Sequence, residues 1–275
     1  MATKAIVTIL IGETYQAMWH ETFRGTWVRY ARRHDYDIII IKDYLDTGPR
    51  GRERAPHWQK LLVLEHPGLR GYEDVVWIDA DILINHHTAP CIVGHNASDK
   101  VGVVSYRDEF QPPQRWDNRY HRRARSGSGG TVLKSPGFPD WYVQAGLGAD
   151  VDDFTNTGVL VMKPRHHADL MRHIYDQFTE NDWSHKENGA LSYWLFKTGA
   201  HNLIDPRFNT SWNGDIIEFY PFLLDHANFS NGRLVSDCVT TAWHNAWMLH
   251  FVESETRHHA GLVRTESPVP PGLRA

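Results

Sequence analysis

The sequence has few cysteines and no long apolar run, and each shortage excludes a class of protein. Cys91 and Cys238 are the only cysteines among 275 residues, and they lie far apart without a paired metal-ligand spacing. Their number and spacing exclude a disulfide framework and a zinc ribbon. The longest early apolar run, Ala5–Ile11, is too short for a signal-peptide core or a membrane-spanning helix. We therefore expect a cytoplasmic protein without a transmembrane segment.

An excess of positive charge is also missing. The formal net charge is −4 and the pI is near 6.5, which argues against nucleic acid as a partner because such binding needs a basic face. A small anionic substrate held by a metal remains compatible with this charge. Hydrophobic residues make up 41% and aromatic residues 12% of the chain, enough for the core of a folded globular protein.

Two carboxylates follow an apolar run that begins at Val75. Side chains alternate along an extended strand, so Asp79 and Asp81 can face one cation while the small Ala80 faces the other way. Two carboxylate oxygens suit a hard divalent cation, whose remaining positions a nucleoside diphosphate can fill. The alternative is an acidic turn that caps the strand.

Hydrophobic periodicity predicts an alternation of strands and helices, and hence a single α/β domain over residues 1–262. The opening strand–helix–strand unit predicts parallel pairing with a right-handed crossover. Residues 107–140 are basic and rich in Gly and Pro without a period, which indicates a long loop or lid, and 263–275 we expect to be a flexible tail. Besides the aspartate strand, we predict strands at 4–11, 36–42, 101–106 and 154–162 and helices at 15–33, 57–65, 166–179 and 187–197.

Three segments, Tyr30–Tyr36, Trp58–Lys60 and Trp77–Leu83, resemble the galactosyl/mannosyl/xylosyltransferase family of yeast Golgi mannosyltransferases and plant xyloglucan xylosyltransferases. More distantly the chain is similar to the family of glycogenin and the lipooligosaccharide galactosyltransferases. The resemblance implies a GT-A fold, which is Rossmann-like and nucleotide-binding, with a mixed, mostly parallel sheet flanked by helices. It also implies a nucleotide-sugar donor, a manganese-type cation and retention of anomeric configuration.

Later segments extend the resemblance. Phe154–Val161 is similar to a family strand whose asparagine and glycine lie near the donor sugar, which places Asn156 and Gly158 there. His250 and the phenylalanine after it look like the pair that supplies the third metal ligand. The segment Leu203–Asn209 also resembles a family segment that ends in asparagine.

Departures from the family pattern leave two roles open. Glu187 and Asn188 stand where the families carry an acidic residue followed by glutamine, and Val252–Glu255 replaces a Gly-containing sequence. Phosphate clamping and the identity of the catalytic group are therefore unsettled by sequence. A helix N-terminus with favourable charge placement is the alternative role for the Glu187–Asn188 pair.

The metal and donor ligands follow from residue chemistry and the resemblance together. An imidazole ligand from His250, beside Asp79 and Asp81, favours Mn²⁺ and leaves Mg²⁺ possible, whereas a core histidine is the alternative. Lys60 is a candidate contact for a donor phosphate or sugar hydroxyl, unless it is an ordinary solvated lysine. Donor contacts are also expected from Ala80.

The end of the first strand is where a nucleotide would bind in an α/β sheet. Thr8, Ile9 and Leu10 are therefore candidate base and ribose contacts. Tyr15 is a candidate for stacking on the base, with an ordinary core tyrosine as the alternative.

The catalytic candidates are Asn188 and Glu187. An amide oxygen carries no formal charge, so Asn188 is a poor nucleophile. We therefore favour front-face transfer, in which a diphosphate oxygen takes the acceptor proton and Asn188 or Glu187 steadies the sugar. A direct nucleophilic role for Glu187 stays open.

The leading hypothesis is a retaining, Mn²⁺-dependent glycosyltransferase. It would move a sugar of the galactose, glucose, mannose or xylose type from a UDP- or GDP-sugar to a saccharide or other hydroxyl acceptor. A metal-dependent nucleotidyltransferase or diphosphate hydrolase could use the same carboxylates. A non-catalytic nucleotide-sugar binding protein is the third hypothesis, because fold does not fix function.

Overall fold

The computed structural model describes residues 3–106, 138–178, 186–252 and 254–266. Most of the predicted loop or lid, residues 107–137, lies outside the described residues. Its last three residues do not continue a loop, because they open the helix α6 (Phe138–Gln144). A helix is favoured there by Trp141 and Tyr142, which are buried against neighbouring aromatic side chains.

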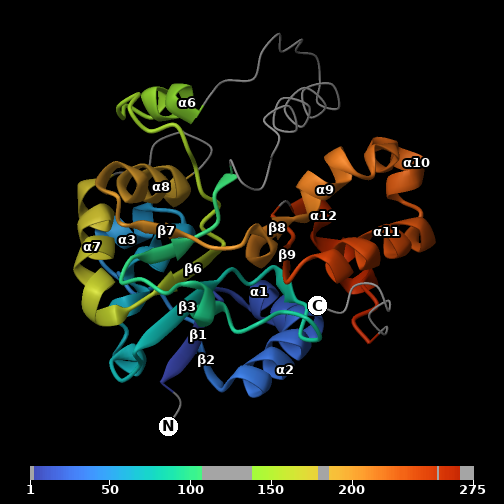
Figure 1. Ribbon diagram of the computed structural model, residues 1–275, viewed down its shortest axis with the longest axis horizontal. Coiled ribbons are helices and arrows are strands. Elements are labelled where there is room, and N and C mark those ends of the chain that lie inside the picture. Colours follow the sequence, from blue (N-terminus) through green and yellow to red (C-terminus); the bar gives the residue numbers. More distant parts are fainter. Residues whose placement is uncertain (1–2, 107–137, 179–185, 253, 267–275) are drawn as a thin grey trace.

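A mixed six-stranded sheet forms the centre of the molecule (Figure 1), in the order β2-β1-β3-β6-β5-β7. β1 pairs in parallel with β2 and β3, and β5 pairs in parallel with β7, whereas β6 runs antiparallel to both of its neighbours. The parallel pairing predicted for the opening unit is confirmed. The strands are β1 (Lys4–Ile9), β2 (Tyr36–Ile41), β3 (Asp74–Ile78), β5 (Val101–Val103), β6 (Val159–Met162) and β7 (His201–Leu203).

Strict alternation along the central strands explains why both faces of the sheet are covered. Ile6 and Val76 belong to a cluster that includes Trp27 of α2 (Arg24–His34), whereas Val7 and Val75 belong to a cluster on the other face. That second cluster takes side chains from η2 (Pro56–Glu65), a 3₁₀-helix, and from α7 (Pro164–Gln177) and α8 (Lys186–Thr198).

A second, three-stranded sheet lies beside the first, with the order β4 (Ile82–Ile84), β9 (Met248–His250) and β8 (Thr210–Ser211). The prediction that one strand carries both aspartates is therefore wrong. β3 ends at Ile78, β4 enters the other sheet at Ile82, and a turn lies between them. The chain changes sheet here because β3 pairs with β6 and β4 pairs with β9.

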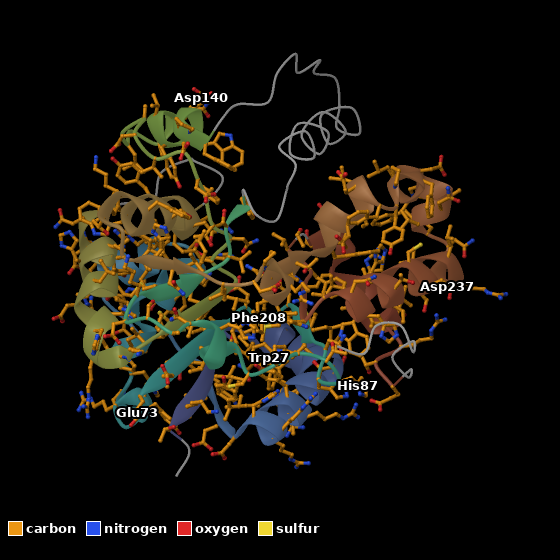
Figure 2. All side chains as sticks on the ribbon, viewed as in Figure 1. Trp27, Glu73, His87, Asp140, Phe208 and Asp237 are labelled. Atoms are coloured by element: carbon orange, nitrogen blue, oxygen red, sulfur yellow. The ribbon has the colours of Figure 1, made fainter. Side chains whose placement is uncertain are left out.

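The predicted helix 15–33 is longer and less regular than expected. It consists of α1 (Glu13–Met18), a π-helical segment η1 (Trp19–Phe23) and α2. Trp27 of α2 and Phe208 both lie near the centre of the molecule (Figure 2) and are fully buried. No helix among the residues described is both long enough and apolar enough to span a bilayer.

Four helices after residue 211 were missing from the sequence interpretation. Three of them are short, and side chains cap three of the four: Ser211 accepts from the Gly214 amide, and Asn231 accepts from the Leu234 amide. Asp225 caps the third in the same way. The helices are α9 (Trp212–Glu218), α10 (His226–Phe229), α11 (Gly232–Asn245) and α12 (Ser254–Arg257).

Candidate metal centre and adjoining polar cluster

Asp79, Asp81 and His250 converge where the two sheets meet. His250 ends β9 and pairs with Ile82, the residue after Asp81, so strand register places the imidazole next to the turn. His250 Nε2 lies 3.2 Å from Asp81 Oδ1 and 3.8 Å from Asp79 Oδ2. The three groups each offer one ligand atom, all within 4.8 Å of one another. Because the aspartates flank a turn, it is the turn and not the strand pleat that aims both at one point.

Asn209 orients the imidazole of His250. Its Oδ1 lies 2.9 Å from His250 Nδ1, and its Nδ2 donates to the Asn156 carbonyl at 2.8 Å. An amide oxygen only accepts, so Nδ1 carries the hydrogen and Nε2 is left for a cation. Two carboxylates and one imidazole form a donor set that fits a divalent cation. His250 is buried, and its Nε2 faces both carboxylates.

Arg257 pairs with Asp81 through the carboxylate oxygen that does not face His250. This residue was not identified from sequence. Its Nη2 and Nε lie 2.9 and 3.2 Å from Asp81 Oδ2. Burial would raise the pKa of Asp81, but the neighbouring His250 and the Arg257 guanidinium outweigh burial and hold this pKa below its usual range. The guanidinium also lies 5.5 Å from the ring centroid of Tyr15. No motif marks Arg257, because it follows the segment that departs from the family pattern.

Gly158 has to be glycine because His250 occupies the space beside it. A Cβ at Gly158 would lie 2.4 Å from His250 Cε1 and 2.6 Å from Nδ1. The Gly158 carbonyl also accepts the Asp79 amide at 2.8 Å, which extends the pairing of β3 and β6 by one step. Gly158 therefore lets the His250 imidazole approach and holds the backbone of Asp79.

A buried polar cluster adjoins the carboxylates and centres on Lys60. Its Nζ lies 2.8 Å from Glu187 Oε1 and 3.2 Å from Asp79 Oδ1. The same nitrogen donates to the carbonyl and hydroxyl oxygens of Thr157 at 3.1 and 3.0 Å. Lys60 is 3% exposed and Glu187 is 1% exposed. The alternative of a solvated helix lysine is therefore wrong, and Thr157 is a further member of the site that sequence reasoning missed.

Each charged group in this cluster favours the ionised form of its partner. Burial alone would lower the pKa of Lys60, but the Asp79 and Glu187 carboxylates outweigh it and raise this pKa. Burial would raise the pKa of Glu187, and the neighbouring Lys60 cation instead holds it below its usual range. Trp77 Nε1 donates to Asp79 Oδ1 at 2.7 Å. Lys60 Nζ and Trp77 Nε1 thus both contact Oδ1 of Asp79, whereas Oδ2 is the oxygen that faces His250.

The remaining candidates lie around this centre with very different exposure. The Thr8 and Leu10 side chains are fully buried and Ile9 is partly buried, whereas Tyr15 is 40% exposed and so is not a core tyrosine. Ala80 is nearly buried in the turn. Asn156 Oδ1 accepts the Gly158 amide at 2.9 Å. Asn188, next to Glu187 on α8, is partly exposed.

Asn209→Ala is expected to weaken Mn²⁺ binding by about 10- to 100-fold, the usual effect of removing the group that orients a metal-binding histidine. Isothermal titration with MnCl₂ measures the change. Asn209→Asp keeps an acceptor for His250 Nδ1 and should retain more affinity than Asn209→Ala. The exposed Asn245→Ala serves as the control. Equal affinities for Asn209→Ala and wild type would contradict the role of Asn209.

Comparisons with known proteins identify the fold. No protein-family model and no curated protein matches the sequence. The structure is similar to a glycosyltransferase involved in glycosylation of the major capsid of PBCV-1, with 14% identity and a TM-score of 0.55 over 94% of this chain and 99% of that one. It is also similar to the bifunctional glycosyltransferase WbbM, with 15% identity and a TM-score of 0.51 over 96% of this chain, which spans 50% of WbbM. The chain therefore has the GT-A fold.

Proposed function

We propose that the protein is a retaining glycosyltransferase that uses Mn²⁺ and a nucleoside diphosphate sugar. The observation that carries the proposal is the convergence of Asp79, Asp81 and His250 beside the Lys60–Glu187 pair. This convergence lies at the carboxyl end of β3, and ligands of α/β sheets bind at the carboxyl ends of strands. A hydroxyl group of a saccharide or another acceptor would receive a sugar of the galactose, glucose, mannose or xylose type.

The cation and its neighbours divide the work of binding the donor. Asp79, Asp81 and His250 would hold the cation, which supplies positive charge to the leaving diphosphate when bound. Arg257 reaches Asp81 from the side of Tyr15. Its guanidinium has five N–H donors, so a phosphate could pair with those that do not face Asp81, and the exposed Tyr15 ring could stack on a base. The families that the sequence resembles carry a Gly-containing segment where this chain has Val252–Glu255. Its absence here is compatible with this use of Arg257.

The burial of Glu187 supports front-face transfer. A nucleophile must reach the anomeric carbon, but Glu187 is 1% exposed and its Oε1 is bonded to Lys60. Asn188 is the more exposed member of the pair and carries no charge. We therefore place the acceptor oxygen on the same face as the leaving diphosphate. The acceptor oxygen forms a bond with the anomeric carbon and gives its proton to a diphosphate oxygen, while the bond from the anomeric carbon to the diphosphate breaks.

Melting temperatures with a panel of UDP-, GDP- and dTDP-sugars, with and without MnCl₂, test the donor site. A donor at about 100 times its Kd stabilises the folded state by about 2.7 kcal/mol, and the shift should need Mn²⁺ and be lost in Asp81→Asn. Sugar transfer to a saccharide panel is then followed by release of the nucleoside diphosphate. Pyrophosphate release from a nucleoside triphosphate and a sugar phosphate would favour a nucleotidyltransferase, and binding without transfer or hydrolysis would favour a binding protein.

A further inference from the structure

Thr157 lies between the buried ion pair and Asn188. It belongs to the segment 154–158, which the sequence pattern assigned to a strand but which precedes β6 as an irregular stretch. Its side chain is fully buried. Thr157 contacts three polar side chains at once: Lys60, Glu187 and Asn188.

The direction of each hydrogen bond around Thr157 follows from its chemistry. The Thr157 backbone amide donates to Asn188 Oδ1 at 3.2 Å, so the Asn188 atom that faces Thr157 is the oxygen. Lys60 Nζ donates to the Thr157 hydroxyl at 3.0 Å. The hydroxyl therefore accepts from Lys60 and gives its own hydrogen to Asn188 Oδ1. The other acceptor, Glu187 Oε1, lies 3.3 Å away and already accepts from Lys60 Nζ at 2.8 Å.

These bonds fix which end of the Asn188 amide meets a ligand. Asn188 Oδ1 accepts twice from Thr157 and is fully used. Within the described ranges, the Asn188 amide nitrogen has no hydrogen-bond partner, and the side chain is partly exposed. Glu187 Oε2 also lacks a partner among these residues, but it is buried away from solvent. Asn188 therefore presents an N–H donor, and not an acceptor, at the edge of the cluster.

The same backbone segment connects Asn188 with the metal centre. Thr157 precedes Gly158, whose carbonyl accepts the Asp79 amide at 2.8 Å. Lys60 Nζ joins Asp79 Oδ1 and the Thr157 hydroxyl at 3.2 and 3.0 Å. A displacement of Thr157 would thus change the position of Asn188 relative to Asp79.

We propose that Thr157 is a positioning residue that locks the Asn188 amide with its NH₂ group turned to an oxygen of the donor sugar. This inference rests on the proposed function, because the sugar is the part of the donor that the amide would contact. Without the Thr157 hydroxyl, Asn188 loses one of its two anchors and its amide can flip, which places an acceptor where a donor is needed. Thr157 itself does not touch the ligand.

Thr157→Val and Thr157→Ser form the matched pair that tests the inference. Valine keeps the shape and removes the hydroxyl, whereas serine keeps the hydroxyl. The readout is the ratio of two dissociation constants, measured with MnCl₂ for the nucleotide-sugar with the largest melting shift and for its free nucleoside diphosphate. We expect Thr157→Val to weaken binding of the nucleotide-sugar by about 10-fold, which corresponds to the loss of about one hydrogen bond. Binding of the free nucleoside diphosphate should not change. Thr157→Ser should restore wild-type binding.

The outcomes separate this inference from the proposed function. If the ratio of the two dissociation constants is the same for wild type and Thr157→Val, the inference alone is overturned. The same holds if both Thr157 variants lose affinity for the nucleotide-sugar and for the free nucleoside diphosphate to an equal extent. A wild type that binds no nucleotide-sugar overturns both. Asn188→Leu covers the case in which Thr157→Val does not fold, because it removes the amide from a partly exposed position. It should show the same selective loss, and a wild-type ratio for Asn188→Leu would overturn the inference.

Discussion

Lys60→Met is expected to lower the free energy of unfolding by about 3–5 kcal/mol, the cost of leaving a buried charge without its partner. Lys60 Nζ lies 2.8 Å from Glu187 Oε1, and both side chains are almost completely buried. Methionine fills a similar volume but supplies no charge and no donor, so Glu187 has to remain ionised without a cation or take up a proton. Urea unfolding followed by circular dichroism measures the change.

A second substitution distinguishes lost charge from lost packing. Glu187→Gln in the Lys60→Met background removes the orphaned carboxylate, so the double variant should recover most of the lost stability. Lys197→Met is the matched control, because Lys197 pairs with Asp150 at the surface with both side chains nearly half exposed. Such a pair contributes about 0–1 kcal/mol. A double variant as unstable as Lys60→Met would show that the loss comes from packing or from Asp79, which also loses Lys60, and not from Glu187.

Gly158→Ala is expected to weaken Mn²⁺ binding by at least about 100-fold, the upper end of the effect of disturbing the surroundings of a metal ligand. The added Cβ would lie 2.4 Å from His250 Cε1, so the imidazole has to leave its position. Gly158 is not among the glycines with positive φ, and the effect is therefore steric and not one of backbone strain. Isothermal titration with MnCl₂ measures it.

The control and the decisive double variant both use alanine. An added Cβ at Gly25 would meet open space, and Gly25 has no positive φ. Gly25→Ala should therefore leave Mn²⁺ binding unchanged and stabilise the helix slightly. In a His250→Ala background the clash is gone, and Gly158→Ala should then cause no further loss of affinity. Additive losses from the two substitutions would contradict a collision between Gly158 and His250.

The sequence predicts the parts of the site that are close in the chain or carry a motif. Asp79 and Asp81 stand two residues apart after a buried strand, and His250 precedes a phenylalanine, so residue type and spacing mark all three. Their convergence depends on the register between β4 and β9. That register joins segments about 170 residues apart, and periodicity carries no information about such a pairing.

The residues that sequence reasoning missed act through contacts that have no sequence signature. Thr157 stands between two residues that the family resemblance marked, yet its role depends on Lys60 and Asn188, which come from η2 and α8. Arg257 was missed because its segment departs from the family pattern. The burial of Lys60 was equally hidden, since a lysine in a short helix is usually solvated and only tertiary contacts with two carboxylates reverse that expectation.

The division of the candidate metal ligands between two sheets would link cation occupancy to local unfolding. Asp79 follows a strand of the large sheet, whereas His250 ends a strand of the small one. A subglobal opening that detaches the small sheet would release a bound cation, so the free-energy cost of the opening would grow with the logarithm of free cation concentration above the Kd. The C-terminal part of the chain would therefore sample open states more often in a cation-poor environment than in a cation-rich one, with no change in its sequence or in the rest of the native ensemble.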